Sequence, residues 1–335
     1  MTPRKKSVRK IFHEYFIPYD DSLLGVVKRI LFVAISGYCG GVTKTVLIFP
    51  GYGCNYKFRD LVSRSNFLRI LKSTLTAGWP ICLKVPSSVS KIHLDPKLRS
   101  SRTARRYGNV IVFFSGEDGK EFVLKIRVGY KNLFREITVL KKLNGEKVLF
   151  PKLVSYDQNG VWHITEKENL RSCSELDSGT LYLKDIAPVY YSKMGLCNRK
   201  VGKYLAREGV SISKFINVMV SEGVSLRILE KWLIGKIIYS IAYGERISKN
   251  LTIGPFGKGF LLDFEDASAK PIALDLVPLW LEHSSQIKNL LDCPSDRETL
   301  DAQAQIMICA AVLSIKRGTP LGSVFKVKNK KSLVL

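Results

Sequence analysis

The sequence predicts an α+β protein with two lobes, a small lobe built on a β-sheet followed by a mainly helical lobe. Short β-branched and aromatic segments separated by turn residues fill residues 109–168, a pattern typical of strands and hairpins. After this region, apolar residues recur at steps of three and four, as they do in amphipathic helices. The stretch "VPSSVS" at 85–90 has the composition of a linker. We therefore expect an N-terminal region of unknown role at 1–87, the sheet lobe at 88–168, the helical lobe at 169–320 and a basic tail at 321–335.

Two hairpins and one helix are expected in the sheet lobe. The segments "NVIVFF" (109–114) and "EFVLKI" (121–126) flank the turn sequence "SGEDGK", which predicts the first hairpin. Leu133, Ile137 and Leu140 have helical spacing, so a helix is expected at 132–143. A second hairpin is expected at 152–168, with its turn at "QNG".

The helical lobe is expected to contain one long, largely buried helix at 225–242. Its apolar residues follow one another at steps of three and four; they are Leu226, Leu229, Leu233, Ile237 and Ile241. This helix would lead directly into "YGERISKN" at 243–250. A short hairpin with its turn at "PFGK" and further helices are expected after it.

The charge is strongly positive but unevenly distributed. The chain has 53 Lys and Arg against 29 Asp and Glu, a formal net charge of +24, yet residues 161–300 hold 18 basic and 17 acidic residues. The surplus therefore lies in the first 160 residues, which include a basic cluster at 99–106, and in the C-terminal tail. Such charge attracts nucleotide phosphates, nucleic acid or an anionic membrane surface, and does not by itself select among them.

Cysteine and hydropathy patterns argue against several classes of protein. The seven cysteines form no Cys-x-x-Cys pair and the four histidines are isolated, which argues against a zinc site and fits a reducing cytoplasm. The apolar stretch at 30–43 is shorter than the roughly 20 residues that span a bilayer. A core helix is expected there, with an interfacial membrane helix as the alternative.

Four residues in succession carry the chemistry that phosphoryl transfer needs. Lys125 lies on a strand and Glu136 lies at the edge of the inward face of the following helix, where it can pair with Lys125. Asp263 ends the strand "GFLLDF", where its carboxylate is well placed to hold magnesium, with Asn250 supplying a neutral oxygen to the same metal. A cation for the nucleotide phosphates and oxygen ligands for magnesium are the parts that this reaction requires.

From about residue 109 to 280, this order of elements resembles the protein-kinase-like fold, in particular its aminoglycoside phosphotransferase and choline kinase branch. "DFED" at 263–266 is similar to the Asp-Phe-Glu of that branch, and "IALDLV" at 272–277 is similar to its later Asp-Leu-Ala. The resemblance implies ATP and Mg²⁺ as cofactors, Asn250 and Asp263 as metal ligands, and Asp263 as part of the catalytic set. It also implies a structural role for Asp275 beneath the catalytic loop. The residues Ile164, Thr165 and Glu166 would form the hinge that binds the nucleotide.

Two departures from the branch are evident. In "YGERISKN", Tyr243 replaces the usual His and Glu245 replaces the usual catalytic Asp. Glu245 keeps a carboxylate one methylene longer, which we expect to preserve activity because phosphoryl transfer tolerates a weak base. No Gly-rich loop precedes residue 109; "RSSRTARRYG" stands there instead, and Arg102 and Thr103 are expected to bind phosphates through charge, hydroxyl and amide groups.

Three functions are compatible with these patterns. The first is an ATP-dependent kinase acting on a hydroxyl of a sugar, a glycan or a lipid-linked saccharide. The second is a catalytically inactive kinase-like module that binds a nucleotide or a partner, and the third is an RNA-associated basic protein. We expect the active kinase, located in the cytoplasm, with its basic ends and the 99–106 cluster in peripheral contact with the inner face of an anionic membrane.

Overall fold

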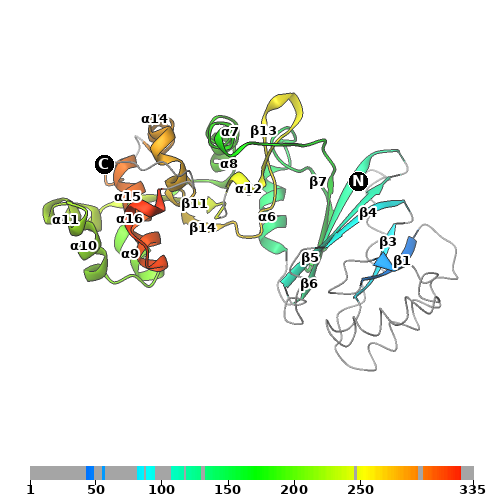
Figure 1. Ribbon diagram of the computed structural model, residues 1–335, viewed down its shortest axis with the longest axis horizontal. Coiled ribbons are helices and arrows are strands. Elements are labelled where there is room, and N and C mark those ends of the chain that lie inside the picture. Colours follow the sequence, from blue (N-terminus) through cyan, green and yellow to red (C-terminus); the bar gives the residue numbers. More distant parts are fainter. Residues whose placement is uncertain are drawn as a thin grey trace, which may run out of the picture. The chain divides into compact units, whose positions relative to one another are not determined.

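The computed structural model describes residues 43–48, 55–56, 81–86, 88–94, 107–116, 118–129, 133–244, 247–292 and 297–325 (Figure 1). The chain divides into two compact units. The first unit consists of residues 1–144 and 151–168, and the second consists of residues 145–150 and 169–335. The apolar stretch at 30–43, for which a helix is expected, lies outside the described residues except for Thr43, the first residue of a strand.

The first unit is built on a five-stranded antiparallel sheet with the strand order β4-β5-β6-β8-β7. Its strands are β4 (Val89–Leu94), β5 (Tyr107–Ser115), β6 (Glu121–Gly129), β7 (Leu153–Tyr156) and β8 (Trp162–Glu166). Both predicted hairpins are confirmed, as β5–β6 and β7–β8. The sequence did not predict β4, which extends the sheet along β5.

The two faces of this sheet differ in polarity because neighbouring residues of a strand point to opposite sides. Val112, Leu124 and Ile164 stand opposite one another across three strands and are fully buried. Lys125 and His163 are also cross-strand partners, and they occupy the other face. The predicted helix is confirmed as α6 (Phe134–Leu143), which connects β6 to β7.

A smaller three-stranded sheet precedes β4 in the chain. Its strands are β1 (Thr43–Ile48), β2 (Asn55–Tyr56) and β3 (Ile81–Pro86), in the order β2-β1-β3 and all antiparallel. The N-terminal region, to which the sequence assigned no role, therefore contains β-structure.

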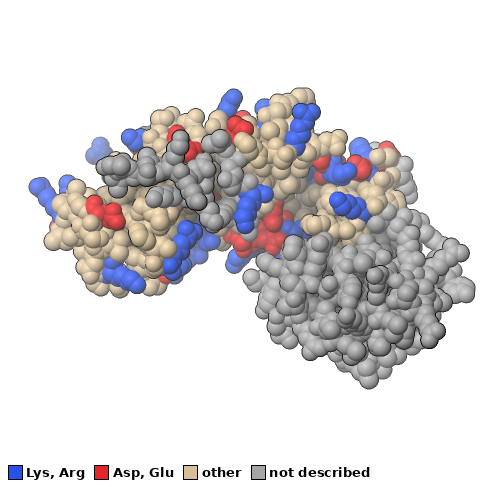
Figure 2. All heavy atoms as spheres, in the orientation of Figure 1, with Lys and Arg blue, Asp and Glu red and all other residues tan. Residues whose placement is uncertain are grey.

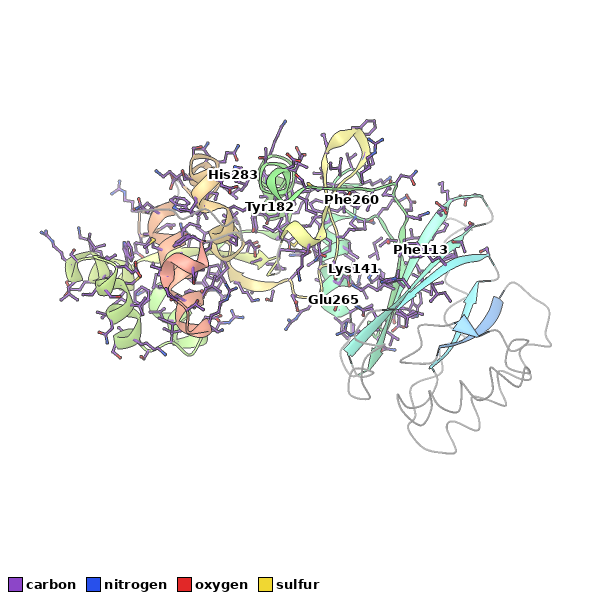
Figure 3. All side chains as sticks on the ribbon, in the orientation of Figure 1. Phe113, Lys141, Tyr182, Phe260, Glu265 and His283 are labelled. Atoms are coloured by element: carbon purple, nitrogen blue, oxygen red, sulfur yellow. The ribbon has the colours of Figure 1, made fainter. Side chains whose placement is uncertain are left out.

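The second unit is mainly helical, as the fold class predicted. Its helices are α7 (Glu175–Leu181), a π-helical turn (Tyr182–Ile186), α8 (Ala187–Met194), α9 (Val201–Arg207), α10 (Ile212–Ser221), α11 (Leu226–Ile234), α12 (Ile247–Asn250), α13 (Ala273–Leu276), α14 (Trp280–Leu291), α15 (Ala302–Arg317) and α16 (Leu321–Val324). Two 3₁₀ turns, Pro255–Gly257 and Val277–Leu279, complete this set. Its buried aromatic side chains include Tyr182 and Phe260, both labelled in Figure 3.

Two small antiparallel sheets accompany these helices, with the orders β10-β11-β14 and β13-β12-β9. Their strands are β9 (Arg171–Ser172), β10 (Cys197–Lys200), β11 (Lys236–Ala242), β12 (Leu251–Ile253), β13 (Gly259–Leu261) and β14 (Ser268–Pro271). The predicted hairpin with its turn at "PFGK" is confirmed as β12–β13.

The prediction of one long buried helix at 225–242 is wrong. Helix α11 ends at Ile234, Gly235 is extended, and residues 236–242 form the strand β11 between β10 and β14. The segment after Gly235 contains three isoleucines at positions 237, 238 and 241, and β-branched residues fit the pleated surface of a sheet. The helix itself buries only Leu229, so it is not largely buried either.

Helix α15 forms the centre of the second unit. Ile308, Cys309 and Val312 are among its buried residues. Gln305 is also fully buried, and its amide accepts a hydrogen bond from the backbone N–H of Ile238 and donates one to the carbonyl of Leu300. The central strand β11, which leads into the loop at 243–250, is thereby attached to the core helix. Among the helices in the described part of the chain, none has the length and apolar character needed to cross a membrane.

Candidate active site

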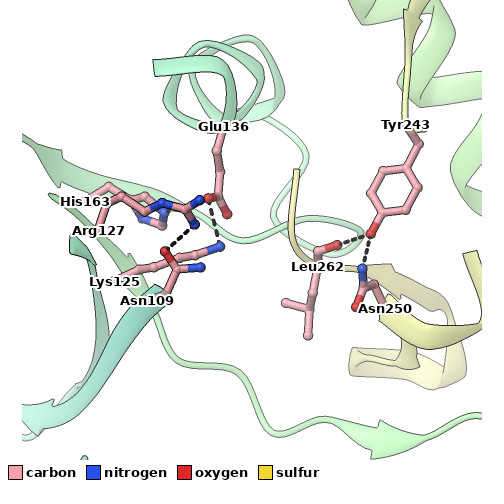
Figure 4. A network of polar contacts seen from close by, with 8 residues as sticks. All are labelled: Asn109, Lys125, Arg127, Glu136, His163, Tyr243, Asn250 and Leu262. Carbon is pink, nitrogen blue, oxygen red and sulfur yellow. Dashed lines mark hydrogen bonds and ion pairs between the residues drawn. The ribbon is translucent and has the colours of Figure 1, made fainter. Parts of the chain in front are cut away.

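In the first unit, Lys125 and Glu136 form a buried ion pair. The ammonium of Lys125 on β6 lies 2.9 Å from a carboxylate oxygen of Glu136 on α6, and the two side chains are only 9% and 5% exposed (Figure 4). The chain brings them together because β6 runs directly into α6, whose first turn carries Glu136. The strand-to-helix order in the sequence predicted this pairing, and the structure contains it.

His163 is a third member of this cluster. It stands opposite Lys125 on β8, and its Nε2 lies 3.5 Å from the same Glu136 oxygen. Burial alone raises the pKa of Glu136, but Lys125 and, after it, His163 outweigh that effect and hold the pKa well below its ordinary value. Glu136 is therefore a carboxylate anion across the whole physiological pH range. Sequence reasoning missed His163, because only the β6–β8 register places it beside Lys125.

A second buried cation lies on the same strand as Lys125. Arg127 is two residues further along β6, hence on the same face, and its guanidinium donates a hydrogen bond of 2.9 Å to the Asn109 side chain on β5 (Figure 4). Both residues are buried. This face of the sheet therefore collects two cations, one carboxylate, one amide and one imidazole, where a structural core would carry apolar groups.

The three residues assigned to the hinge lie at the end of β8. Ile164 and Thr165 are buried within the sheet and pair with Leu124 and Val123 of β6. Glu166 forms an ion pair with the ammonium of Lys152. The chain leaves the first unit two residues later, after Glu168. A role of these residues in nucleotide binding stays a prediction.

In the second unit, Asp275 fixes the start of the loop at 243–250. Its carboxylate is buried and accepts hydrogen bonds from the backbone N–H groups of Tyr243 (2.6 Å) and Gly244 (2.9 Å) and from the hydroxyl of Tyr191 (2.7 Å). The hydroxyl oxygens of Tyr182 and Tyr191 lie 3.0 Å apart. Because the Tyr191 hydroxyl donates its only proton to Asp275, the Tyr182 hydroxyl must be the donor in this second hydrogen bond. Burial raises the pKa of Asp275, and the three donors act against that shift. The structural role that the resemblance implied for Asp275 is confirmed.

The hydroxyl of Tyr243 connects two further segments of this unit. It donates a hydrogen bond of 2.7 Å to the carbonyl of Leu262 and accepts one of 2.7 Å from the amide nitrogen of Asn250 (Figure 4). The ring packs edge-on against Phe264 at a centroid distance of 5.8 Å. The residue that replaces the usual His therefore has a defined task, which is to hold Asn250 and the Asp263 segment in fixed positions.

The β12–β13 hairpin brings Asn250 and Asp263 close together. Leu251 pairs with Leu261, and the N–H of Leu262 donates to the carbonyl of Asn250, so Asp263 follows directly after the residue beside Asn250. The amide nitrogen of Asn250 donates to Tyr243, and the amide oxygen is the atom of this side chain that has lone pairs for a metal ion. A carboxylate and an amide oxygen are the ligand types that Mg²⁺ selects, so these residues fit the metal that the resemblance implies.

The backbone at Asp263 is unusual. Its φ is +58°, in the left-handed region that non-glycine residues seldom adopt, although Asp tolerates it better than most. The carboxylates of Asp263 and Glu265 have oxygens within 4.8 Å of each other. Backbone strain of this kind is found preferentially at functional sites.

Three predicted site residues lie outside the described part of the chain. They are Glu245, which follows Gly244 in the loop, and the pair Arg102 and Thr103, which fall between the paired strands β4 and β5. Their assignments stay predictions.

Comparison with known proteins gives similarity at the level of structure alone. No protein-family model matches the chain, and no curated protein matches its sequence. Among solved structures, the choline kinase of Streptococcus pneumoniae is 15% identical, with a TM-score of 0.41 over 81% of this chain and 93% of that one. An amicoumacin kinase in complex with AMP-PNP and Ca²⁺ is 12% identical, with a TM-score of 0.39 over 82% of this chain and 90% of that one. A type I macrolide 2′-phosphotransferase is 12% identical, with a TM-score of 0.36 over 78% and 96%. All three are named as kinases or phosphotransferases.

Proposed function

We propose that this protein is an ATP-dependent phosphotransferase that transfers a phosphoryl group to a hydroxyl of a small molecule. The observation that carries the proposal is the buried Lys125–Glu136 ion pair on the polar face of the sheet. A buried ion pair adds little to stability, because the cost of removing both charges from water offsets their attraction. A lysine held in this way is better explained by a ligand with negative charge, and nucleotide phosphates are such a ligand.

The machinery that we propose consists of nucleotide-binding residues and metal-binding residues. In the first unit, Lys125 binds the phosphates of ATP and Glu136 positions Lys125, while Arg102 and Thr103 add phosphate contacts and Ile164, Thr165 and Glu166 bind the nucleotide base. In the second unit, Asn250 and Asp263 hold Mg²⁺, which when bound neutralises charge on the phosphates.

Glu245 is proposed to orient the acceptor hydroxyl and to accept its proton. It follows Gly244, whose N–H is fixed by Asp275, so the backbone leading to the carboxylate begins from a defined position. Tyr243 also helps to hold this part of the chain in place, because its hydroxyl bonds to Asn250 and to the carbonyl of Leu262. Orientation of this kind is the main contribution that a protein makes to phosphoryl transfer.

The proposed acceptor is a hydroxyl of a sugar, a glycan or a lipid-linked saccharide. A cationic acceptor would be favoured by an acidic surface, but residues 161–300 hold 18 basic against 17 acidic residues. This balance favours a neutral or weakly charged acceptor.

Nucleotide binding is the first test. ATP with Mg²⁺ at about a hundred times its dissociation constant should raise the free energy of unfolding by roughly 2.7 kcal/mol, which a thermal-shift assay detects. Lys125→Met should abolish this stabilisation, whereas Lys167→Met, which removes a partly exposed strand-end lysine paired with Glu121, should preserve it. If the parent protein binds no nucleotide at all, the proposal is wrong.

Separate substitutions then test the proposed metal ligand and the proposed base. Asp263→Ala should abolish turnover and the Mg²⁺-dependent part of ATP binding, and Asp266→Ala, which removes an exposed carboxylate three residues away, should change neither.

Glu245→Gln should leave ATP binding intact and lower turnover by about 10² to 10⁴. Binding of ATP without transfer to any hydroxyl acceptor would support the alternative of a nucleotide-binding module.

A further inference from the structure

One long helix of the second unit contains a π-helical turn. Helix α7, the turn Tyr182–Ile186 and helix α8 follow one another without a break, from residue 175 to residue 194 (Figure 1). In the turn, the N–H of Ala187 bonds to the carbonyl of Tyr182, five residues back rather than four. Such turns are rare and are frequent at functional sites. A turn of this kind changes which side chains of the helix share a face.

The sequence supplies a local cause for the turn. Pro188, the second residue of α8, has no N–H to donate to the carbonyl of Leu183 or Lys184, and a proline ring crowds the carbonyl four residues before it. The α-helical series of hydrogen bonds cannot continue unchanged through these residues. A local feature of the sequence therefore favours the change of register just before the proline.

The turn brings two tyrosines to one side of the helix. Tyr182 and Tyr191 are nine residues apart, and an unbroken α-helix, which rotates by about 100° per residue, would direct them to opposite sides. The π turn accommodates one additional residue, which reduces the difference in direction to about 80°. The two hydroxyls can then meet, and they lie 3.0 Å apart. Without the turn, Tyr182 would point away from the hydrogen bonds that end on Asp275.

Tyr182 is the outer end of this series of hydrogen bonds. It is fully buried, and burial, with Asp275 adding to the effect, raises its pKa, so the hydroxyl keeps its proton and donates it to Tyr191. Tyr191 donates to Asp275, which holds the first two N–H groups of the loop at 243–250. The start of the π turn therefore acts on the backbone that leads to Glu245.

The other end of the turn holds the strand that leads to Asp263. The carboxylate of Asp185 accepts a hydrogen bond of 2.9 Å from the N–H of Gly259, the first residue of β13. The approach is close because Gly259 has no Cβ; one there would lie 3.3 Å from the carbonyl oxygen of Leu181 and 3.4 Å from the side chain of Ile186. Strand β13 ends two residues before Asp263, so Asp185 fixes the start of the segment that carries this proposed metal ligand.

The positive charge of the chain does not account for this turn. On the face that Figure 2 shows, Lys and Arg side chains are spread over the second unit rather than gathered in one patch. The basic ends of the chain and the cluster at 99–106, where the sequence predicts a membrane contact, lie mostly outside the described residues, and that contact stays a prediction. The polar groups of Tyr182 and Asp185 are instead used within the second unit.

We propose that the π turn positions the loop at 243–250 and the Asp263 segment together, with Tyr182 and Asp185 as positioning residues of the phosphotransferase. One contact fixes the backbone before the proposed base, and the other fixes the backbone before the proposed metal ligand. Because both contacts come from one turn of a helix, a displacement of that turn would move base and metal ligand at once. The expected effects on turnover rest on the proposed function, whereas the positions of the two segments can be measured without nucleotide.

Amide hydrogen exchange of the free full-length protein tests the tyrosines. Tyr191→Phe should speed exchange of the two N–H groups bonded to Asp275 by about tenfold, because it removes a donor to that carboxylate. Tyr182→Phe should speed it by about threefold, because it only weakens that donor. Tyr190→Phe is the matched control, since Tyr190 is in the same helix and fully buried, and its hydroxyl has no hydrogen-bond partner among the described residues. The control should exchange like the parent.

Asp185 is tested at Gly259 in the same way. Asp185→Ala should speed exchange of the Gly259 N–H by about tenfold. Asp185→Asn should stay within about twofold of the parent, because its amide oxygen can accept the same hydrogen bond. In a turnover assay, Asp185→Ala should raise the Mg²⁺ concentration for half-maximal activity by about threefold or more, and Asp185→Asn should restore it. Tyr182→Phe should lower kcat by about threefold and leave the KM for ATP unchanged, since the residues proposed to bind ATP lie in the first unit.

Three outcomes would overturn the proposal. The first is equal exchange at the N–H groups bonded to Asp275 in Tyr182→Phe and Tyr190→Phe. The second is exchange at Gly259 that Asp185→Ala leaves unchanged. The third is exchange that rises equally along the whole helix at 175–194, because the turn would then only stabilise that helix.

Circular dichroism melting checks that each variant is folded. The expected exchange rates in a protein without turnover would refute the proposed function and still support the positioning of the two segments by the turn.

Discussion

Tyr243 acts through its hydroxyl, which both donates to Leu262 and accepts from Asn250. It therefore connects the proposed metal ligand Asn250 to the residue that precedes Asp263. A substitution that removes only this oxygen should loosen two proposed ligands at once without disturbing the ring, which packs against Phe264.

We expect Tyr243→Phe to lower the free energy of unfolding by about 1–3 kcal/mol, because it leaves a carbonyl and an amide without this partner. It should also raise the Mg²⁺ concentration needed for half-maximal turnover. The control is Tyr190→Phe, since the buried hydroxyl of Tyr190 has no hydrogen-bond partner among the described residues. That control should leave both quantities nearly unchanged. Equal effects of the two substitutions in urea denaturation and magnesium titration would contradict the assigned role.

Glu136 predicts how stability responds to acid. Its pKa in the folded protein lies below the ordinary value of 4.5, so the unfolded chain takes up a proton first as the pH falls. The stabilisation is fully present above that ordinary value and is lost progressively as the pH decreases toward the lower, folded pKa. Between these two values the parent protein should therefore lose stability with acid.

Replacing Glu136 should remove that acid dependence. Glu136→Gln should give a flatter profile of unfolding free energy below pH 4.5, although it should be less stable than the parent at neutral pH, because Lys125 is left buried without its anion. Chemical denaturation at a series of pH values measures both effects. Glu230→Gln, which removes an exposed carboxylate on α11, is the control, and a Glu136→Gln profile parallel to that of the control would refute the assignment.

At the scale of elements, the sequence predicted most of the structure that positions the site. β-branched runs around turn sequences predicted β5, β6, β7 and β8, and helical spacing predicted α6. The boundary between α11 and β11 was missed, because Ile237 and Ile241 continue the helical spacing of the leucines before them. Only the pairing of β11 with β10 and β14 decides in favour of a strand, and that pairing is a tertiary property.

The residues of the candidate site also divide into those that local sequence patterns predict and those that only the tertiary fold brings together. The Lys125–Glu136 pair is local in the chain, joined by one strand-to-helix connection, and it was predicted. His163 depends on strand register, and Tyr191 reaches Asp275 across 84 residues of sequence. Contacts over such distances leave no periodic signal in a single sequence, so neither residue could be assigned in advance.

The loop after β11 depends on the conformation of Gly244. Its φ is +81°, and a Cβ atom there would lie 2.9 Å from the carbonyl oxygen of Asp266. We expect Gly244→Ala to lower the free energy of unfolding by about 1–3 kcal/mol through backbone strain, and to lower turnover by displacing the backbone that leads to Glu245.

Gly202 offers a matched control on α9. A Cβ atom there would meet only the carbonyl oxygen of Leu233, at 3.9 Å. Gly202→Ala should therefore leave turnover unchanged and stabilise the helix by roughly 0.4–1 kcal/mol. Thermal denaturation and a steady-state assay of both variants decide the matter; a Gly244→Ala protein as active as Gly202→Ala would show that the loop tolerates another conformation.

For the whole molecule, the net charge of +24 allows RNA as a competing partner. The salt dependence of the binding affinity distinguishes RNA binding from ATP binding. Binding that neutralises six to ten phosphates of a single strand should weaken by roughly 300-fold to 10⁴-fold between 50 and 200 mM salt, whereas affinity for Mg²⁺-ATP should change far less. Fluorescence anisotropy with labelled single-stranded RNA and with a labelled ATP analogue measures the two affinities in parallel. We expect the analogue to remain bound at the higher salt concentration and RNA to dissociate. RNA binding that is insensitive to salt would favour the RNA-associated function.

The way in which Asp275 holds its loop has a consequence for evolution and for the detection of distant relatives. The carboxylate accepts hydrogen bonds from the backbone N–H groups of Tyr243 and Gly244, and every amino acid except proline provides such a group. The backbone can therefore keep its path while the side chain at 243 is exchanged, for example from His to Tyr. A search pattern based on side chains at 243 and 245 discards such a chain. A pattern based on the spacing of 31 residues between the loop glycine and its buried aspartate would retain it.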